Sequence, residues 1–566
     1  MRLLLSCIKK LFVFPIFISA TYSPLAGAEE NVLHVYQPTA PDHLDNVAPV
    51  LGAHMSRTTY MMQDGLFLKH PHVERVIPGI ATGCKSLEKN LDRKIEENTV
   101  HYCTLRKDAK WSDGTPISAY DFEFAWKRHV SAKNHSKHKG ILRILKNWEQ
   151  ITSGNLDLNE LGVMAVEIDG DLKLKIETEE PMPFLEQTLA DWGFFPYPAP
   201  ELFKEDRTQL PYLLDDQPQK VFSGYSLENL EDFLAKAPCS GPYCIQEKGW
   251  FIDNDKNQPD IKELVFTKNP HYWNPDYQQA DKIVVRYGHR DVEAYSDPSI
   301  SFGFDLDYAK VAEIKNESLK TVSGAGFFSY LKLSDNIDKE IREAIALLVD
   351  RESLLKVTGP IGTSTETISY PDLMEGYNMP TQKVGVTAEE KIEAYNKPIQ
   401  TIYYLHKNHV FPGDKELGEQ LAEQLKPYGI NLKIIDKREE PNLDKDAWTI
   451  FRGACFGKIR TPYTYLQYFV QGGVIDIGAG EAPLQAFNEG ARYGLDSQEH
   501  IVNMKKAEIL LLNHKTLIPM FQLNGYNFVG ESLRSVKVNK DGLYTGLTTW
   551  EKPDFFRDNT RWIGVE

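Results

Sequence analysis

Residues 105–128, "LRKDAKWSDGTPISAYDFEFAWKR", constrain the fold of this chain more than any other stretch. The residues just before them, "TVHYCTLR", alternate as a strand does. "SDGTP" has the composition of a tight turn, because Asp and Gly tolerate left-handed backbone and Pro cannot continue a strand. Ser118 then stands three residues before Asp121, which is the capping-box arrangement that opens a helix. We therefore predict a strand, a turn and a helix in close succession.

The predicted helix, "YDFEFAWKRHV", has one apolar face. Phe122, Ala125 and Trp126 fall on that face, and Glu123 and Lys127 form an i, i+4 pair. Every residue of the stretch then has a structural role, so we interpret it as scaffold rather than as a catalytic loop or a nucleic-acid clamp. The charged residues ahead of the turn are expected to form a solvated rim: Lys107, Asp108 and Lys110.

The N-terminus has the order of a secretory signal. A basic leader (Arg2, Lys9 and Lys10) is followed by the apolar run "LFVFPIFISA" and by the small residues 26–28. The run is short for a membrane span, which needs about 20 apolar residues. We predict a signal peptide at 1–28 that is cleaved before Glu29, with a membrane anchor as the alternative. Because no lipid-acceptor cysteine follows Gly27, the mature protein is expected to be soluble and not membrane-anchored.

Length and charge limit the class of protein. A chain of 566 residues is too long for one core and indicates two to four domains. Its net charge is −16, and cleavage of the basic leader makes it more acidic. A nucleic-acid binder needs a basic surface. This composition therefore argues against nucleic acid as a partner.

Five cysteines follow the leader. In an exported protein the default interpretation is disulfide bonds with one remaining thiol. Cys84 and Cys103 flank a plausible hairpin, and Cys239 and Cys244 could close the loop "SGPY", which leaves Cys455. Metal binding is the alternative, but neither spacing is typical of zinc and no histidine pair accompanies the cysteines. The sequence leaves the connectivity open.

Later segments have α/β character. Residues 401–405 are predicted to be a buried strand, 415–429 an amphipathic helix and 430–436 a second strand, which together make a βαβ unit with a parallel strand pair. Residues 338–360 are predicted to form one amphipathic helix that stops at Gly359 and Pro360. Residues 504–523 are predicted to be a helix followed by a strand.

Motifs of enzymes and cofactor sites are missing. The chain has no G-x-S-x-G, H-E-x-x-H or G-x-x-x-x-G-K-[ST] sequence, so we expect no catalytic residues, no metal and no cofactor. His129, His135 and His138 cluster in "RHVSAKNHSKHKG". We interpret that cluster as a solvated basic loop, with a ligand contact or a metal site as the alternative.

Four segments in order resemble one known family. They are residues 105–128, "ELVFTKNPHYWNP" (263–275), "KEIREAIALLVDRESLL" (339–355) and "AEILLLNHKTLIPMFQLN" (507–524). Together they resemble extracytoplasmic solute-binding protein family 5, the periplasmic oligopeptide- and dipeptide-binding receptors of ABC importers. The resemblance implies an α/β, two-lobe periplasmic-binding-protein fold (class II type) with an extra domain inserted in the first lobe.

The resemblance also implies a division of the chain and a function. A periplasmic, monomeric receptor would close its two lobes on a peptide or peptide-like ligand and deliver it to the permease subunits of an ABC importer. The implied segments are the signal peptide 1–28, lobe I at 29–66, the inserted domain at 67–188, lobe I again at 189–320, lobe II at 321–535 and a return to lobe I at 536–566.

The family's ligand segment matches "FRGACFGKIRTPYTYL" (451–466), and the match departs from the family at one position. Lys458 falls where the family has the Asp that holds the peptide ammonium, and no Asp or Glu occurs between Arg452 and Tyr465. Two ligand classes stay open: a peptide whose amine finds another carboxylate, or a ligand with an anionic or blocked end. The candidate ligand-binding residues are Arg452, Lys458 and Arg460 for positive charge, Gly453 and Ala454 for backbone groups, Phe456 as an apolar wall and His138 near the pocket.

Other functions remain open for the same sequence. A ligand sensor or a chaperone for exported chains would keep the same fold. An exported hydrolase with Cys455 as its nucleophile is the alternative from a different class, although no recognised nucleophile motif surrounds that cysteine.

Overall fold

The computed structural model describes somewhat more than three fifths of the chain. The described residues are 31–37, 53–69, 76–86, 99–131, 139–206, 238–253, 260–278, 280–287, 301–303, 319–358, 362–369, 377, 379, 386–407, 413–436, 443–444, 446–456, 461–470, 475 and 477–529. The predicted signal peptide at 1–28 and the predicted return at 536–566 lie outside them. None of the helices in these ranges is long and apolar enough to cross a membrane.

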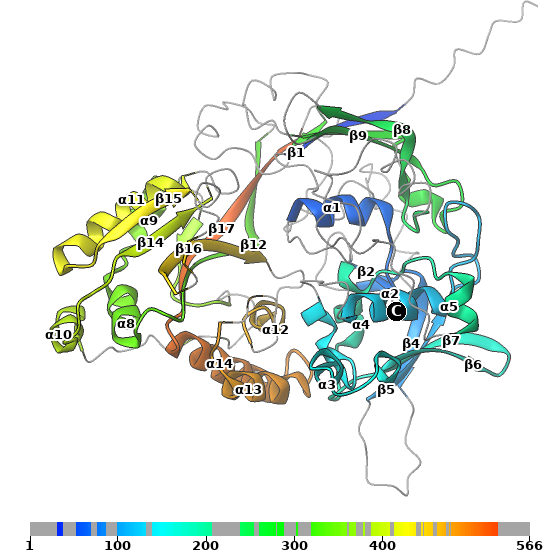
Figure 1. The fold of residues 1–566 in the computed structure, drawn as a ribbon. Coiled ribbons are helices and arrows are strands. Elements are labelled where there is room, and N and C mark those ends of the chain that lie inside the picture. The colour runs from blue at the N-terminus through cyan, green and yellow to red at the C-terminus, as the bar shows by residue number, and fades with distance from the viewer. Residues whose placement is uncertain are drawn as a thin grey trace, which may run out of the picture.

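A mixed sheet of eleven strands runs through the described part of the molecule (Figure 1). Neighbouring strands follow one another in the order β15 (Leu432–Asp436), β14 (Ile402–His406), β16 (Trp448–Phe456), β12 (Leu319–Leu333), β17 (Leu517–Val529), β11 (Phe302–Gly303), β1 (Val32–Gln37), β10 (Lys282–Tyr287), β9 (Asp260–Lys268) and β8 (Tyr243–Asp253), while β13 (Gly362–Ser364) pairs with β17.

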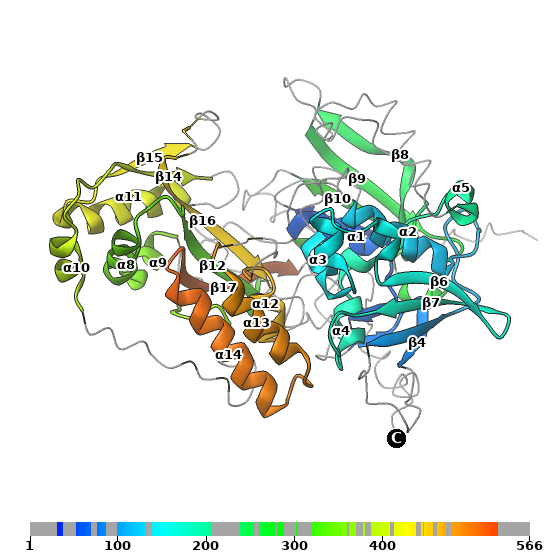
Figure 2. The same cartoon turned by 60° about the horizontal axis from the view of Figure 1, so that its bottom comes forward.

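Two long strands join the halves of this sheet. β12 and β17 pair antiparallel at Leu319–Val322 and again at Phe327–Lys332, with a register shift between the two stretches. The first stretch lies beside β11, and the second lies beside β16. Figure 2 shows one body of strands and helices on each side of this junction. The connection between the bodies is therefore made of continuous, hydrogen-bonded strands.

The predicted βαβ unit is confirmed. β14 and β15 are parallel, β14 is also parallel to β16, and α11 (Asp414–Leu425) forms the crossover. Leu417, Leu421 and Leu425 are fully buried in a core that they share with Ile402 and Tyr404. Apolar spacing of three to four residues places these leucines on the face of α11 that covers the sheet.

The single helix predicted over 338–360 is wrong. The structure has two helices, α8 (Lys339–Leu348) and α9 (Arg351–Thr358). Val349 takes an extended conformation after its N–H closes α8 on the Ile345 carbonyl at 3.1 Å. Asp350 then accepts from the Ser353 N–H at 3.2 Å, as a residue that precedes a helix does. The apolar periodicity continues across this break, so periodicity alone could not reveal it.

A second layer of helices covers the opposite face of β12 and β16. It contains α12 (Pro462–Leu466), α13 (Glu481–Ala491) and α14 (Gln498–Asn513). On the other side of the sheet, α10 (Ala388–Ala394) packs on α8. α14 leads directly into β17, which confirms the helix and strand predicted over 504–523. Phe328 and Tyr330 of β12 share one core with Leu511 of α14.

A small antiparallel sheet forms a separate module with short helices. Its order is β4 (Ala81–Ser86), β5 (Val100–Leu105), β7 (Asp171–Glu177) and β6 (Val163–Ile168). We call this sheet and the helices around it the small-sheet module. The helices are α2 (Ala119–Val130), α3 (Trp148–Thr152), α4 (Leu185–Leu189) and α5 (Glu201–Glu205), while α1 (Ala53–Met62), β2 (Phe67–Lys69) and β3 (Val76–Pro78) precede the module.

The strand, turn and helix predicted from the opening stretch are confirmed. Ser118 and Asp121 form the capping box of α2, and Phe122, Ala125 and Trp126 are fully buried. The Trp126 indole N–H donates to the Phe194 carbonyl at 3.0 Å. The predicted rim is exposed at all three positions: Lys107, Asp108 and Lys110.

The i, i+4 pair of α2 lies in the core. Glu123 and Lys127 have 0% and 1% of their side-chain surface exposed, and Lys127 Nζ lies 2.8 Å from Glu123 Oε1. Lys127 Nζ also donates to Asn159 Oδ1 at 3.2 Å, and Glu123 Oε2 accepts from the Ala165 N–H of β6 at 2.8 Å. The pair therefore anchors α2 to the small sheet and is more than a surface pair.

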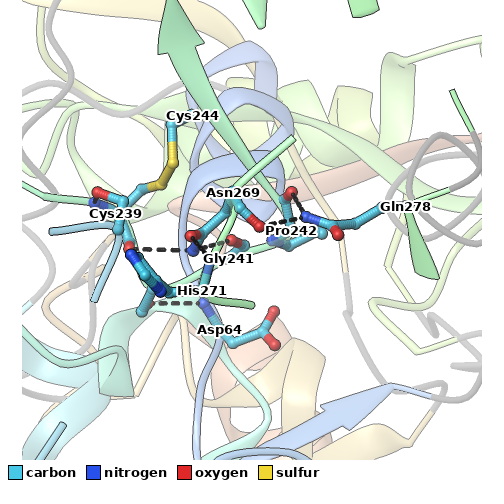
Figure 3. The surroundings of a disulfide bond; sticks show 10 residues. Asp64, Cys239, Gly241, Pro242, Cys244, Asn269, His271 and Gln278 are labelled. Atoms are coloured by element: carbon cyan, nitrogen blue, oxygen red, sulfur yellow. Dashed lines mark hydrogen bonds between the residues drawn. A yellow bond between two sulfur atoms is a disulfide. The ribbon is translucent and has the colours of Figure 1, made fainter. Parts of the chain in front are cut away.

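Both predicted disulfide pairings are present. Cys84 and Cys103 stand directly opposite each other on β4 and β5 and are bonded. Cys239 and Cys244 close the short loop that leads into β8 (Figure 3). Cys455 is the remaining thiol and is buried.

The Cys239–Cys244 loop is a junction between distant segments. The Cys239 carbonyl accepts from the Ser112 N–H at 2.9 Å, so the loop holds the turn of the opening stretch. The Asn269 Nδ2 amide donates to the Gly241 carbonyl at 2.9 Å, and the Gln278 amide donates to the Pro242 carbonyl at 2.6 Å (Figure 3). These bonds tie the loop to residues 269–278, which begin with the "NPHYW" segment.

Removing this disulfide should cost moderate stability. Six residues span Cys239 to Cys244, and closing a loop of that length removes unfolded-state entropy worth about 2 kcal/mol. We expect a Cys239→Ser, Cys244→Ser variant to lose that much unfolding free energy in urea titrations while it keeps the wild-type far-UV spectrum. An unchanged unfolding midpoint would show that the hydrogen bonds alone fix the loop.

A buried carboxyl group lies beside this junction. Asp64 Oδ2 accepts from the Tyr272 hydroxyl at 2.6 Å and from the Trp273 indole N–H at 3.1 Å. The Arg106 guanidinium lies 3.7 Å from the centroid of the Trp273 ring. Burial raises the pKa of the Asp64 carboxyl from 3.8 to about 6, although the bonds from Tyr272 and Trp273 act in the opposite direction. The cluster therefore joins Asp64 to two of the four family-like segments, residues 105–128 and 263–275.

Candidate functional site

The candidate ligand segment begins in β16, which lies between β14 and β12 in the large sheet. β16 pairs antiparallel with β12, so that Gly453 stands opposite Tyr330 and Arg452 opposite Leu331. A Cβ atom at Gly453 would lie 2.4 Å from both Cζ and Oη of Tyr330. Position 453 therefore has to be glycine for the Tyr330 ring to lie across the strand.

Arg452 brings a positive charge into this sheet. Its side chain is buried, and its Nε donates to the Ser329 hydroxyl at 3.0 Å. Its guanidinium lies 5.9 Å from the centroid of the Phe521 ring. A buried guanidinium is a favourable partner for a carboxylate because both oxygens can accept from it in the same plane.

Cys455 lies in an aromatic environment. It stands opposite Phe328, whose ring stacks on Tyr330 at 5.6 Å, and Phe469 meets the Tyr330 ring edge-on at 5.3 Å. Burial raises the pKa of the Cys455 thiol far above its ordinary value. A thiol that stays protonated is a poor nucleophile, so the site lacks the activated cysteine that a hydrolase would need.

One edge of β16 is open in the described structure. β14 pairs with β16 only at Trp448–Ile450, and no described strand is paired with Phe451–Phe456 on the side away from β12. Alternate residues of this stretch direct their backbone N–H and C=O groups to that side. An extended chain can pair with such an edge through main-chain hydrogen bonds.

The structure brings together only part of the predicted site. Arg452, Gly453 and Ala454 lie side by side in β16, and the backbone of Phe456 ends the strand. Lys458, Arg460 and His138 lie outside the described residues, so their predicted roles stay predictions. Among the described residues, no group of three or more His, Cys, Asp and Glu side chains could hold a metal ion.

Two residues that contact the candidate site could not be identified from the sequence. Ser329 and Tyr330 reach Arg452 and Gly453 only through the β12–β16 register. These contacts join residues more than 120 positions apart. The sequence contains no local pattern that indicates such a pairing.

A side chain at Gly453 should disturb this strand pair. We expect Gly453→Ala to lower the unfolding free energy by about 1–3 kcal/mol, because the added methyl group overpacks the Tyr330 ring. Gly83→Ala is the matched control: Gly83 also lies in a strand, and a Cβ there meets nothing within 4 Å. Equal urea midpoints for the two variants would contradict the steric role of Gly453.

Comparison with family models gives a match over residues 75–476 to "Bacterial extracellular solute-binding proteins, family 5 Middle". The chain belongs to this family. Its members are solute receptors and not enzymes, which agrees with the unreactive setting of Cys455 and confirms the prediction of a non-enzymatic receptor.

Curated relatives and solved structures extend the match to most of the chain. The periplasmic murein peptide-binding protein MppA of Escherichia coli is 22% identical over 558 residues, which cover 91% of each chain. The structure of Haemophilus influenzae OppA in complex with RPPGFSPFR is 18% identical, with a TM-score of 0.71 over 92% of this chain and 98% of that one. The chain therefore has the predicted α/β fold of solute-binding protein family 5.

A third solved structure is less similar to this chain by TM-score. MppA in its unliganded open form gives a TM-score of 0.57, at 20% identity, over 92% of this chain and 97% of that one. The described structure is thus more similar to the peptide complex than to this open form.

Proposed function

We propose that the chain is a periplasmic receptor that closes two lobes on a peptide or peptide-like ligand and delivers it to the permease subunits of an ABC importer. The observation that carries this proposal is the open edge of β16 beside the buried Arg452, in a member of a solute-binding family. The edge can bind an extended backbone whatever its side chains are. Arg452 can bind a ligand carboxylate.

Three further points support the proposal. Relatives over most of the chain are a periplasmic murein peptide-binding protein and an oligopeptide-binding protein. A periplasmic oligopeptide-binding protein of Escherichia coli matches over 35% of the chain. The leader at 1–28 has the composition of an export signal. A division into lobe I (29–66, 189–320 and 536–566), an inserted domain (67–188) and lobe II (321–535) would put β16 in lobe II.

A second ligand class is favoured by one feature of the sequence. Between Arg452 and Tyr465 the chain has Lys458 and Arg460 but no carboxylate. A peptide ammonium would meet net positive charge there, whereas an anionic end would be attracted and an uncharged, blocked end would not be repelled. The alternative function is therefore a receptor of the same fold for an anionic or N-blocked solute.

Native mass spectrometry of protein purified from a periplasm without denaturation tests both functions. We expect retained masses that fragment as peptides, and binding of added peptide mixtures in thermal-shift titrations. N-acetylated and free forms of the same peptides then separate the ligand classes. If the acetylated form binds more tightly and Lys458→Asp reverses that preference, the blocked-end class is correct. Absence of any peptide, retained or added, would reject the peptide proposal.

A further inference from the structure

The small-sheet module makes direct contact with the helices behind the candidate site. Phe184, at the start of α4, is buried, and its ring meets Tyr463 of α12 edge-on at a centroid distance of 4.8 Å. The same ring lies 5.9 Å from His500 of α14. Tyr463 in turn stacks on Phe487 of α13 at 4.6 Å. One phenylalanine from the module thus reaches a pocket of rings from all three helices, which we call the Phe184 seat (Phe184, Tyr463, Phe487 and His500).

Polar contacts surround the Phe184 seat. Arg492 follows α13, and its Nη2 atom lies 2.7 Å from Oε2 of Glu180 in the module. Arg143 of the module lies 5.9 Å from the centroid of the Phe487 ring. His500 is held in place because its Nδ1 lies 2.9 Å from the Gly490 carbonyl. The contact therefore has an apolar centre and a charged rim, as stable interfaces between folded units do.

The Phe184 seat continues into the candidate ligand segment. β16 ends at Phe456, and α12, which carries Tyr463, begins at Pro462. The intervening residues contain Lys458 and Arg460. Thr461 caps α12 by accepting from the Thr464 N–H, so the start of this helix is fixed. A contact that holds α12 therefore holds the far end of the segment that the ligand is proposed to meet.

The position of the Phe184 seat also couples it to the arrangement of the two bodies. β12 and β17 continue from one body to the other, and the seat is a second contact between the same bodies, made by side chains. Rotation about the two strands would separate Phe184 from Tyr463. The described arrangement gives a TM-score of 0.71 with the OppA complex and 0.57 with open MppA.

We propose that Phe184 is a positioning residue for ligand binding: it latches the small-sheet module onto α12–α14 and so stabilises the closed arrangement of the two bodies. Its role in binding rests on the proposed receptor function, whereas its role in closure does not. A contact made only in the closed state raises the population of that state, and the apparent ligand affinity rises with that population. Loss of one buried aromatic contact corresponds to about a ten-fold change.

The first experiment measures closure without any ligand. Spin labels are attached through Lys107→Cys in the module and Lys426→Cys after α11, whose side chains are 90% and 76% exposed. We expect Phe184→Ala to shift the distribution of label distances to longer values, and Phe184→Tyr to retain most of the short distances. Phe203→Leu is the control, because Phe203 is an equally buried ring of the module that packs on Phe124 of α2. Identical distance distributions for wild type and Phe184→Ala would overturn the proposal.

The second experiment measures binding of a defined probe, the nonapeptide RPPGFSPFR. We expect Phe184→Ala to weaken its binding about ten-fold, mainly through faster dissociation, while Phe203→Leu leaves the affinity unchanged. Equal affinities of wild type and Phe184→Ala would refute the positioning role in binding. If the wild type binds no peptide and the label distances still lengthen, the latch stands and the peptide proposal fails.

Discussion

Replacing Lys127 with methionine should lower the free energy of unfolding by about 3–5 kcal/mol, because it leaves the buried Glu123 carboxylate without its cation. Glu123 would keep the bond from the Ala165 N–H, but a neutral donor does not offset the loss of solvation of a full charge. Urea unfolding followed by tryptophan fluorescence measures the change.

Two further variants separate charge from packing. The double variant Glu123→Gln, Lys127→Met removes both charges, and we expect it to regain most of the lost stability. Lys107→Met breaks the Lys107–Asp171 pair of the same module, whose side chains are 90% and 56% exposed, and should change stability by less than about 1 kcal/mol. A small effect of Lys127→Met, equal to that of Lys107→Met, would mean that the buried pair contributes no more than a surface pair.

Asp64→Asn should make the protein more stable at neutral pH. Burial raises the pKa of the Asp64 carboxyl from 3.8 to about 6, so the folded protein holds this proton more tightly than the unfolded chain does. The resulting stability is fully present below about pH 4 and is lost as the pH rises through about 6. Two pKa units correspond to about 3 kcal/mol. The asparagine keeps an acceptor for Tyr272 and Trp273 and has no proton to lose.

The difference between the two proteins isolates this carboxyl from all other titrating groups. Urea titrations of wild type and Asp64→Asn at several values between pH 4 and pH 8 should give nearly equal stabilities at the acidic end. The gap should open mainly between about pH 4 and pH 6, the two pKa values, and stay constant above about pH 7, in favour of the variant. A gap that is constant with pH would mean that Asp64 titrates alike in the folded and unfolded chains.

Features that depend on local chemistry could be predicted from the sequence. The capping box at Ser118, the turn before it and the buried face of α2 all follow from residues within one or two turns of each other. The two disulfides could be proposed because each joins cysteines of one hairpin or loop. The family resemblance supplied the fold, which no local pattern contains.

Features that depend on long-range contacts could not be predicted. The spacing of Glu123 and Lys127 is typical of a surface pair. Only the tertiary structure shows that β6 and Asn159 cover the pair. Position 453 needs a glycine because the Tyr330 ring lies against it. That contact arises only from a strand pairing between residues more than a hundred positions apart. The break between α8 and α9 arises because Asp350 can cap a new helix while Gln424 accepts its N–H from outside. In each case a tertiary neighbour decides between two locally acceptable structures.

The order of synthesis gives the shared strands β12 and β17 a further meaning. β11 and β12 both pair with β17, which begins only at Leu517. Until that residue has left the ribosome, both strands lack their common neighbour and keep an unpaired edge. The N-terminal half of the chain therefore cannot complete its own sheet, and neither half is a finished folding unit before β17 has been made.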